Sequence, residues 1–195
     1  MQKNRKLVEG ALLIAISVIL TRFMSIKISV LGVDGVRIGL GVMPIIIAGL
    51  RNGAFEGAKV GALADIIGYA LSPGGAYMPH FTLTSALNGI LPPLLIGKKE
   101  NINSGRIIFS VGLTFLITSM ILVPYFLNIL FGIPYKVIFL PRLISFILNV
   151  FLMNTTLIVL EKRVNILSLE AYMKMLKRNR PSLTGAIKRK YIDEA

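Results

Sequence analysis

Hydrophobic positions divide most of the chain into long apolar segments separated by short polar ones. These segments contain almost no charged residues, as expected for helices that face lipid. They predict helices over 7–24, 37–50, 54–71, 81–96, 107–131 and 140–160. The second is short for a full crossing, which needs ~20 residues, and we expect it to be tilted, partly buried or broken near Pro44. The pattern is that of an all-α integral membrane protein with about six transmembrane helices.

The distribution of positive charge predicts how these helices are oriented. With both termini on one side, sixteen of the 22 basic residues fall on that side and five on the other, while Lys59 lies within a helix. The positive-inside rule then puts both termini in the cytoplasm. The 25–36, 72–80 and 132–139 loops face outward. We expect one six-helix transmembrane domain over 1–163 and a basic cytoplasmic tail over 164–195 that lies against anionic lipid.

Composition excludes several classes of function. The net charge of +13 flanks apolar segments and does not form a patch on a polar domain, so nucleic acid is not an expected partner. With no cysteine and one histidine, thiolate sites and multi-histidine metal sites are excluded within one chain. The sequence has no phosphate-binding loop, no HExxH and no paired catalytic carboxylates. We therefore expect no cofactor, and we expect any coupling to ATP to come from partner proteins.

A stripe of small residues in the third segment ends in a carboxylate. Every fourth position from 53 to 61 is glycine, and Asp65 continues the same helix face. Small residues at this spacing let a second helix approach closely. A carboxylate deep in a membrane span is costly, so Asp65 is a candidate ligand-binding residue. The alternative is a structural ion pair with Arg37 or Arg142.

Two arginines are predicted to open helices at the outer face. The guanidinium groups of Arg37 and Arg142 could hold carboxylates of an anionic solute in bidentate pairs, or else anchor lipid headgroups. Arg142, Ser145 and Asn149 form a polar stripe, which in a membrane must face protein or a water-filled cavity. We therefore include Arg142 and Asn149 among the candidate ligand-binding residues.

More candidates surround the start of the fourth segment. His80, Thr84 and Asn88 share one helix face at four-residue spacing. Tyr77 and Phe81 could stack on a flat ring, or could belong to an interfacial aromatic belt. In the first segment, Ala11 and Ala15 form a small-xxx-small pair suited to helix packing within the chain or to docking on a partner protein.

Three stretches carry a resemblance to a known family. Residues 36–49 (VRIGLGVMPIIIAG), 57–65 (GAKVGALAD) and 74–82 (GGAYMPHFT) are similar to the folate-family substrate-binding (S) components of energy-coupling factor (ECF) transporters. The resemblance implies capture of a vitamin, in the first place a folate, from outside the cell. It also implies delivery inward with a transmembrane coupling subunit and two cytoplasmic ATPase subunits, and no catalysis by the chain itself. Ala11 and Ala15 would then dock on the coupling subunit.

Other functions remain open at this point. An S component of the same fold could take riboflavin, pantothenate or a queuosine precursor. A small intramembrane enzyme could use Asp65 and His80 as acid and base. A packing or lipid-binding scaffold would pair its polar faces only with each other.

Overall fold

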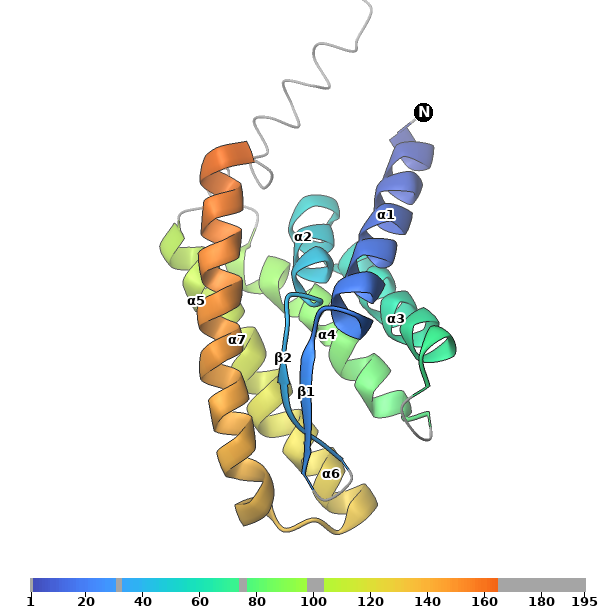
Figure 1. The fold of residues 1–195 in the computed structure, drawn as a ribbon. Helices are drawn as coiled ribbons and strands as arrows, with labels where there is room; N and C mark the ends of the chain where they lie inside the picture. The colour runs from blue at the N-terminus through green and yellow to red at the C-terminus, as the bar shows by residue number, and fades with distance from the viewer. Residues whose placement is uncertain (1, 31–32, 74–76, 98–103, 165–195) are drawn as a thin grey trace, which may run out of the picture.

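A computed structural model describes residues 2–30, 33–73, 77–97 and 104–164 as a helical bundle with one β-hairpin (Figure 1). Its elements are α1 (Gln2–Arg22), β1 (Ile26–Val30), β2 (Val33–Ile38), α2 (Met43–Asn52), α3 (Ala54–Leu71), α4 (Pro79–Ile96), α5 (Ser104–Phe115), a π-helix η1 (Leu116–Leu122), α6 (Val123–Phe131) and α7 (Tyr135–Val164). Because α5, η1 and α6 are continuous, there are six helical segments in the described ranges. This confirms the six-helix prediction.

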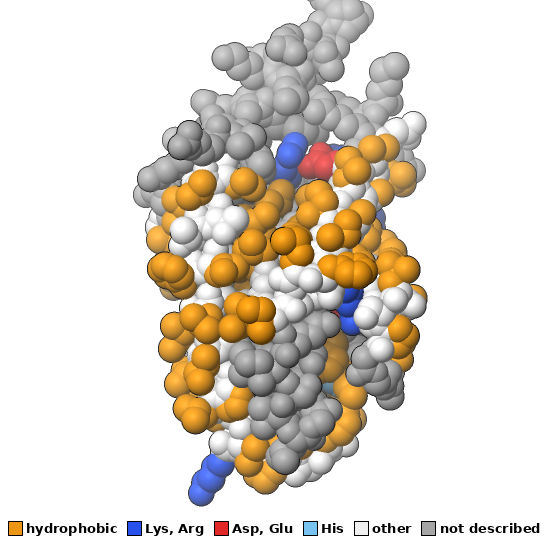
Figure 2. Space-filling view, in the orientation of Figure 1, with side chains coloured by type: hydrophobic (Ala, Val, Ile, Leu, Met, Phe, Trp, Pro, Cys, Tyr) orange, Lys and Arg blue, Asp and Glu red, His pale blue; other side chains and the backbone are white. Residues whose placement is uncertain are grey.

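The two ends of the described chain lie at the same end of the bundle, as an even number of crossings requires (Figure 1). Two continuous helical stretches, Gly105–Phe131 and Tyr135–Glu161, are long and apolar enough to cross a membrane by length and composition. Figure 2 shows apolar side chains over much of the described surface, and Phe55, Phe109 and Phe151 are each more than half exposed. An apolar surface this extensive suits contact with lipid. The predicted basic tail lies almost wholly outside the described residues.

The β-hairpin corrects the prediction of a loop over 25–36. Strands β1 and β2 pair antiparallel, with Ile26 opposite Ile38 and Lys27 opposite Arg37. The sequence signal is the alternation of apolar and polar residues in Ile-Lys-Ile-Ser-Val, which has the period of a strand. Arg37 therefore lies on β2 and does not open a helix, contrary to the prediction.

Two other helix boundaries differ from the prediction. Helix α2 begins at Met43, with Pro44 in its first turn, because the ring of proline presets the helical φ angle and its missing N–H is not needed there. Pro44 therefore starts the helix and does not break it. Helix α7 begins at Tyr135, directly after Pro134, so most of the predicted 132–139 loop is helical. Arg142 consequently lies two turns inside α7 and not at its start.

Helices α2, α3 and α4 pack so closely that their backbones are in contact at glycine residues. A Cβ atom at Gly57 would lie 2.6 Å from the Gly49 Cα and would collide with the Gly89 carbonyl oxygen. One turn further along α3, the Ser85 hydroxyl donates to the Gly61 carbonyl oxygen at 2.9 Å. These contacts confirm the close-packing interpretation of the glycine stripe. Gly53 differs, since its φ of 99° belongs to the turn before α3.

The buried apolar residues of the described ranges form three clusters, the smallest of which joins α6 and α7 through Val123, Leu127 and Ile138. The largest cluster joins α2, α5 and α7 and includes Ile46, Ile107 and Met153, all fully buried. A second joins α1, α2 and α3 around Val18, Ile45 and Ala48. These packed regions hold the helices around a polar cavity.

Candidate ligand-binding site

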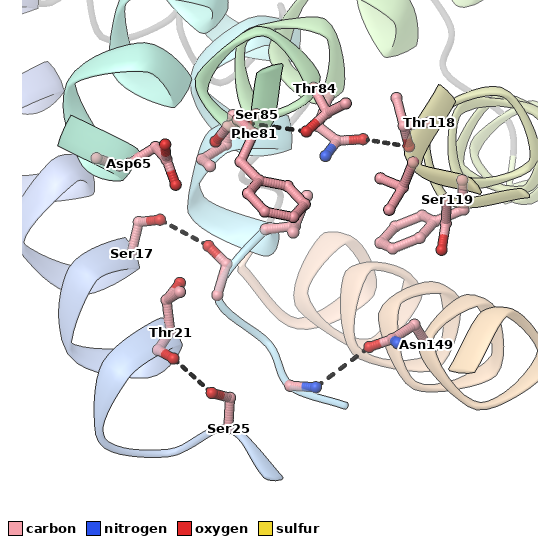
Figure 3. A pocket seen from close by; sticks show the side chains of 18 of the residues that line it. Ser17, Thr21, Ser25, Asp65, Phe81, Thr84, Ser85, Thr118, Ser119 and Asn149 are labelled. Atoms are coloured by element: carbon pink, nitrogen blue, oxygen red, sulfur yellow. Dashed lines mark hydrogen bonds between the residues drawn. The ribbon is translucent and has the colours of Figure 1, made fainter. Parts of the chain in front are cut away.

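A polar cavity of about 150 Å³ lies inside the bundle (Figure 3). It is bounded by α1, α2, α3, α4, α7, the continuous α5–η1–α6 helix, and the short segment between β2 and α2. The lining residues are Ser17, Thr21, Arg22, Ser25, Gly39, Gly41, Val42, Ile45, Ala64, Asp65, Phe81, Thr84, Ser85, Asn88, Phe115, Thr118, Ser119, Val123, Arg142 and Asn149. The cavity thus contains hydroxyls, amides, one carboxylate and two guanidinium groups. Within a membrane such polar groups are costly unless they form hydrogen bonds or ion pairs with a ligand or with each other.

The segment that links the hairpin to α2 forms one wall. The Ser17 hydroxyl on α1 donates to the Gly41 carbonyl oxygen at 2.7 Å. On the other side, the Gly39 N–H donates to Asn149 Oδ1 of α7 at 3.2 Å. A Cβ atom at Gly41 would lie 2.9 Å from the Thr21 Cα, so only glycine fits against α1 there. The wall therefore joins the first and last helices of the bundle (Figure 3).

Asp65 provides the carboxylate of the cavity. It lies on α3, and Figure 3 shows its side chain turned into the cavity. Thr82, in the first turn of α4, donates a hydrogen bond to Asp65 Oδ2 at 2.7 Å. A carboxylate has about four acceptor sites, so this bond leaves several for a ligand.

Asn88 and the π-helix form the opposite wall. The Thr118 hydroxyl lies 3.0 Å from Asn88 Oδ1 and 2.9 Å from the Thr114 carbonyl oxygen. Thr118 and Ser119 both line the cavity although they are adjacent in sequence. Both belong to the π-helix η1, a rare type of turn within a helix. Such turns inside α-helices often occur at functional sites.

Two arginines contribute positive charge. Arg142 is 7% exposed and reaches the cavity from α7. Arg22 reaches it from the last turn of α1, and its Nη1 donates to the Ser72 carbonyl oxygen at 3.2 Å. The Arg22 side chain passes over Gly68 of α3, where a Cβ atom would lie 2.9 Å from its Nε. Gly68 therefore provides the space in which Arg22 lies.

Six of the nine predicted ligand-binding residues line the cavity: Asp65, Phe81, Thr84, Asn88, Arg142 and Asn149. Tyr77 does not line it: its hydroxyl lies 2.7 Å from Thr82 Oγ1 and its ring packs on Tyr69. His80 does not line it either, because its ring is buried between Phe81 and Phe126 at centroid distances of 4.4 and 5.1 Å. The Arg37 side chain lies outside the described residues.

The sequence did not predict several polar lining residues, among them Arg22, Thr118 and Ser119. Arg22 had a signal, since a cation at the end of an apolar helix either marks topology or faces a site. The π-helix has no such signal, because its residues continue the apolar pattern of a regular helix.

The predicted docking pair faces outward. Ala11 and Ala15 are both exposed on α1. Leu12 and Ile16, which flank the pair, are also exposed. The pair is therefore accessible to a partner and does not pack inside the chain.

Comparison with known proteins assigns the class. Residues 1–165 match the family described as "ECF-type riboflavin transporter, S component". A curated relative, the folate transporter FolT of Clostridium novyi (strain NT), is 29% identical over 145 residues, which is 74% of this chain and 81% of the relative. The chain belongs to the family of S components of ECF-type transporters.

Solved structures share this fold. The crystal structure of FolT bound with folic acid superposes with a TM-score of 0.70 at 24% identity, covering 81% of this chain and 93% of that one. The structure of the S component of a bacterial ECF transporter gives a TM-score of 0.62 at 23% identity, covering 84% and 96%. As a member of this family, the protein is a multi-pass integral membrane protein, in agreement with its two long apolar helices. It is a transporter subunit that binds a vitamin, not an enzyme.

Proposed function

We propose that this S component binds a folate. The curated relative is a folate transporter, and the solved structure of FolT holds folic acid. The family description instead names riboflavin. Both vitamins carry a flat fused ring, so the distinction rests on the polar groups that the cavity offers to the edge of that ring.

The Asp65 carboxylate is the observation that carries the proposal. The pterin ring of folate presents two adjacent donors, a ring N–H and an exocyclic amino group, which match the two oxygens of a carboxylate. The isoalloxazine ring of riboflavin presents a single N–H between two carbonyl oxygens. These carbonyl oxygens would repel the Asp65 carboxylate, because both groups only accept hydrogen bonds. The carboxylate would then be removed from water without enough hydrogen-bond donors. Asp65, bonded to Thr82 and facing the cavity, therefore favours the pterin.

The arginines support the same ligand. Folate carries two carboxylates on its glutamate, whereas riboflavin carries none. Arg22 and Arg142 line the cavity and can donate to carboxylates through planar, bidentate geometry. Arg37, on β2, remains a candidate for the same role. Phe81, on the cavity wall, can cover the ring, and Asn88 or Asn149 can read its edge.

The size of the cavity suggests how the ligand lies. Its volume of about 150 Å³ suits a two-ring head group, whereas drug-sized ligands usually occupy about 300–1,000 Å³. We infer that the pterin lies between Asp65 and Asn88, and that the benzoyl-glutamate extends past Arg22 and Arg142, which line the cavity and can contact its carboxylates.

Transport requires partners. The chain has no phosphate-binding loop, so we propose that ATP hydrolysis is supplied by two cytoplasmic ATPase subunits and is transmitted through a transmembrane coupling subunit. Ala11 and Ala15 would form part of the docking surface on α1. We also propose that both termini are cytoplasmic, since the excess of basic residues lies on their side.

Titration of the purified full chain with folic acid and with riboflavin tests the proposal. We expect folic acid to bind and riboflavin to bind far more weakly. Asp65→Asn replaces one acceptor oxygen by a donor, so it should weaken folic acid binding while leaving the fold intact. Tight riboflavin binding by the wild-type chain, without folic acid binding, would overturn the assignment.

A further inference from the structure

A chain of hydrogen bonds connects an exposed tyrosine to the carboxylate of the cavity. Tyr77 Oη lies 2.7 Å from Thr82 Oγ1, and Thr82 Oγ1 lies 2.7 Å from Asp65 Oδ2. Tyr77 lies just before α4 and is 42% exposed. Thr82 belongs to the first turn of α4, and Asp65 to the middle of α3. Three residues from two helices and the segment between them are therefore joined by two short bonds.

The chemistry of the groups gives this chain a single direction. The threonine hydroxyl has one hydrogen, and it donates that hydrogen to Asp65. The Thr82 oxygen can then only accept from Tyr77, so the tyrosine hydroxyl donates. Donation from Tyr77 polarises the Thr82 hydroxyl and makes it a better donor to the carboxylate. The order is Tyr77 to Thr82 to Asp65.

Ring packing holds the outer end of the chain in place. The Tyr77 ring lies 5.1 Å from that of Tyr69, at an interplanar angle of 59°. Tyr69 is one helical turn after Asp65 on the same face of α3. Tyr77 is therefore fixed both to the helix that bears the carboxylate, through its ring, and to the helix that bears Thr82, through its hydroxyl.

We propose that Thr82 and Tyr77 are positioning residues that make Asp65 selective for the donor edge of the ligand ring. The Thr82 hydroxyl fixes the rotation of the carboxylate and occupies one acceptor site on Oδ2. The remaining sites then face the cavity in one orientation. This role replaces ring stacking as the function of Tyr77. It rests on the proposed binding of a folate, because the pterin supplies the two donors.

Variants of the full chain and a ligand analogue test this inference together. Thr82→Val removes the hydroxyl but keeps the shape, and Thr82→Ser retains the hydroxyl. Tyr77→Phe removes only the outer donor, and Tyr125→Phe makes the same change at an exposed tyrosine on α6. The ligands are folic acid and an analogue that lacks the exocyclic amino group of the pterin. The dissociation constant is measured for each pair.

We expect Thr82→Val to weaken folic acid binding by ~5–50-fold, as for the loss of a hydrogen bond to a charged group. It should weaken analogue binding by a much smaller factor, because the analogue lacks the donor that the positioned carboxylate reads. Tyr77→Phe should show the same selectivity with a smaller loss. Thr82→Ser and Tyr125→Phe should bind both ligands as the wild type does.

Two results would overturn the positioning role while leaving the proposed function intact. One is an equal loss of affinity for both ligands in Thr82→Val, which would indicate general damage to the site. The other is unchanged affinity for both ligands. A wild-type chain that does not bind folic acid would instead overturn the proposed function, and this inference with it.

Discussion

Asn149 on α7 accepts a hydrogen bond from the backbone N–H of Gly39, which lies 110 residues earlier in the chain. Its amide nitrogen donates to the Ser145 carbonyl oxygen at 2.8 Å. The side chain thus ties the segment after the β-hairpin to the last helix, next to the cavity. Asn149 is a candidate ligand-binding residue, and this contact gives it a structural role as well.

We expect Asn149→Leu to lower the stability of the protein in detergent by ~1–3 kcal/mol, because it leaves the Gly39 N–H without its partner. Thermal unfolding of the purified chain measures this. Thr155→Leu, at an exposed position on the same helix, is the control and should have little effect. Equal melting temperatures for both variants would show that the Gly39 contact is unimportant.

We expect Gly57→Ala to destabilise the bundle by ~1–3 kcal/mol, since a methyl group would force apart the backbones at Gly49 and Gly89. Gly112→Ala is the matched control: it is also a helical glycine, but a methyl group there would meet no other atom within 4 Å. Alanine at that position should be neutral or slightly stabilising, because it favours the helix. The comparison is made by thermal unfolding, and similar effects at both sites would contradict the crossing geometry.

Replacement of Ala11 and Ala15 together by Trp should abolish uptake in cells that contain the whole transporter. Folic acid binding by the isolated chain should be unchanged, since both residues are exposed and neither lines the cavity. Bulky side chains at this spacing block close approach of a partner helix. Ile147→Trp, on the exposed face of α7, is the control and should support normal uptake. Loss of binding in the Ala11 and Ala15 variant would mean that the pair supports the fold.

Arg22→Lys and Arg142→Lys test recognition of the ligand carboxylates. Lysine keeps the charge but loses the planar fork, so each change should weaken folic acid binding by ~10–100-fold, or ~1–3 kcal/mol. Arg51→Lys, which retains a cation next to Glu9 on α1, should bind normally. Titration of the purified variants measures the effect. Normal binding by both Arg22→Lys and Arg142→Lys would contradict the carboxylate role and favour a neutral ligand.

The apolar pattern was sufficient to predict the helices, because lipid contact requires long runs of apolar residues and leaves a strong signal. The same apolar signal predicts some element boundaries wrongly, above all near the β-hairpin. Only residues 39–42 separate the strand that contains Arg37 from an apolar helix, so the sequence does not show the boundary between the two elements clearly. Asp65 and Asn88 were found because polar groups within a span are conspicuous. Thr118 could not be found in this way, since a single hydroxyl within a run that continues the apolar pattern of a regular helix is not conspicuous.

The molecule that co-purifies with the full chain, expressed in cells grown in rich medium, tests the proposed function most directly. The protein is purified in detergent and denatured, and the released small molecule is identified by mass spectrometry. We expect a folate at close to one molecule per chain, and much less of it in Asp65→Asn. A stoichiometric flavin, or any other released molecule without a pterin, would contradict the proposal.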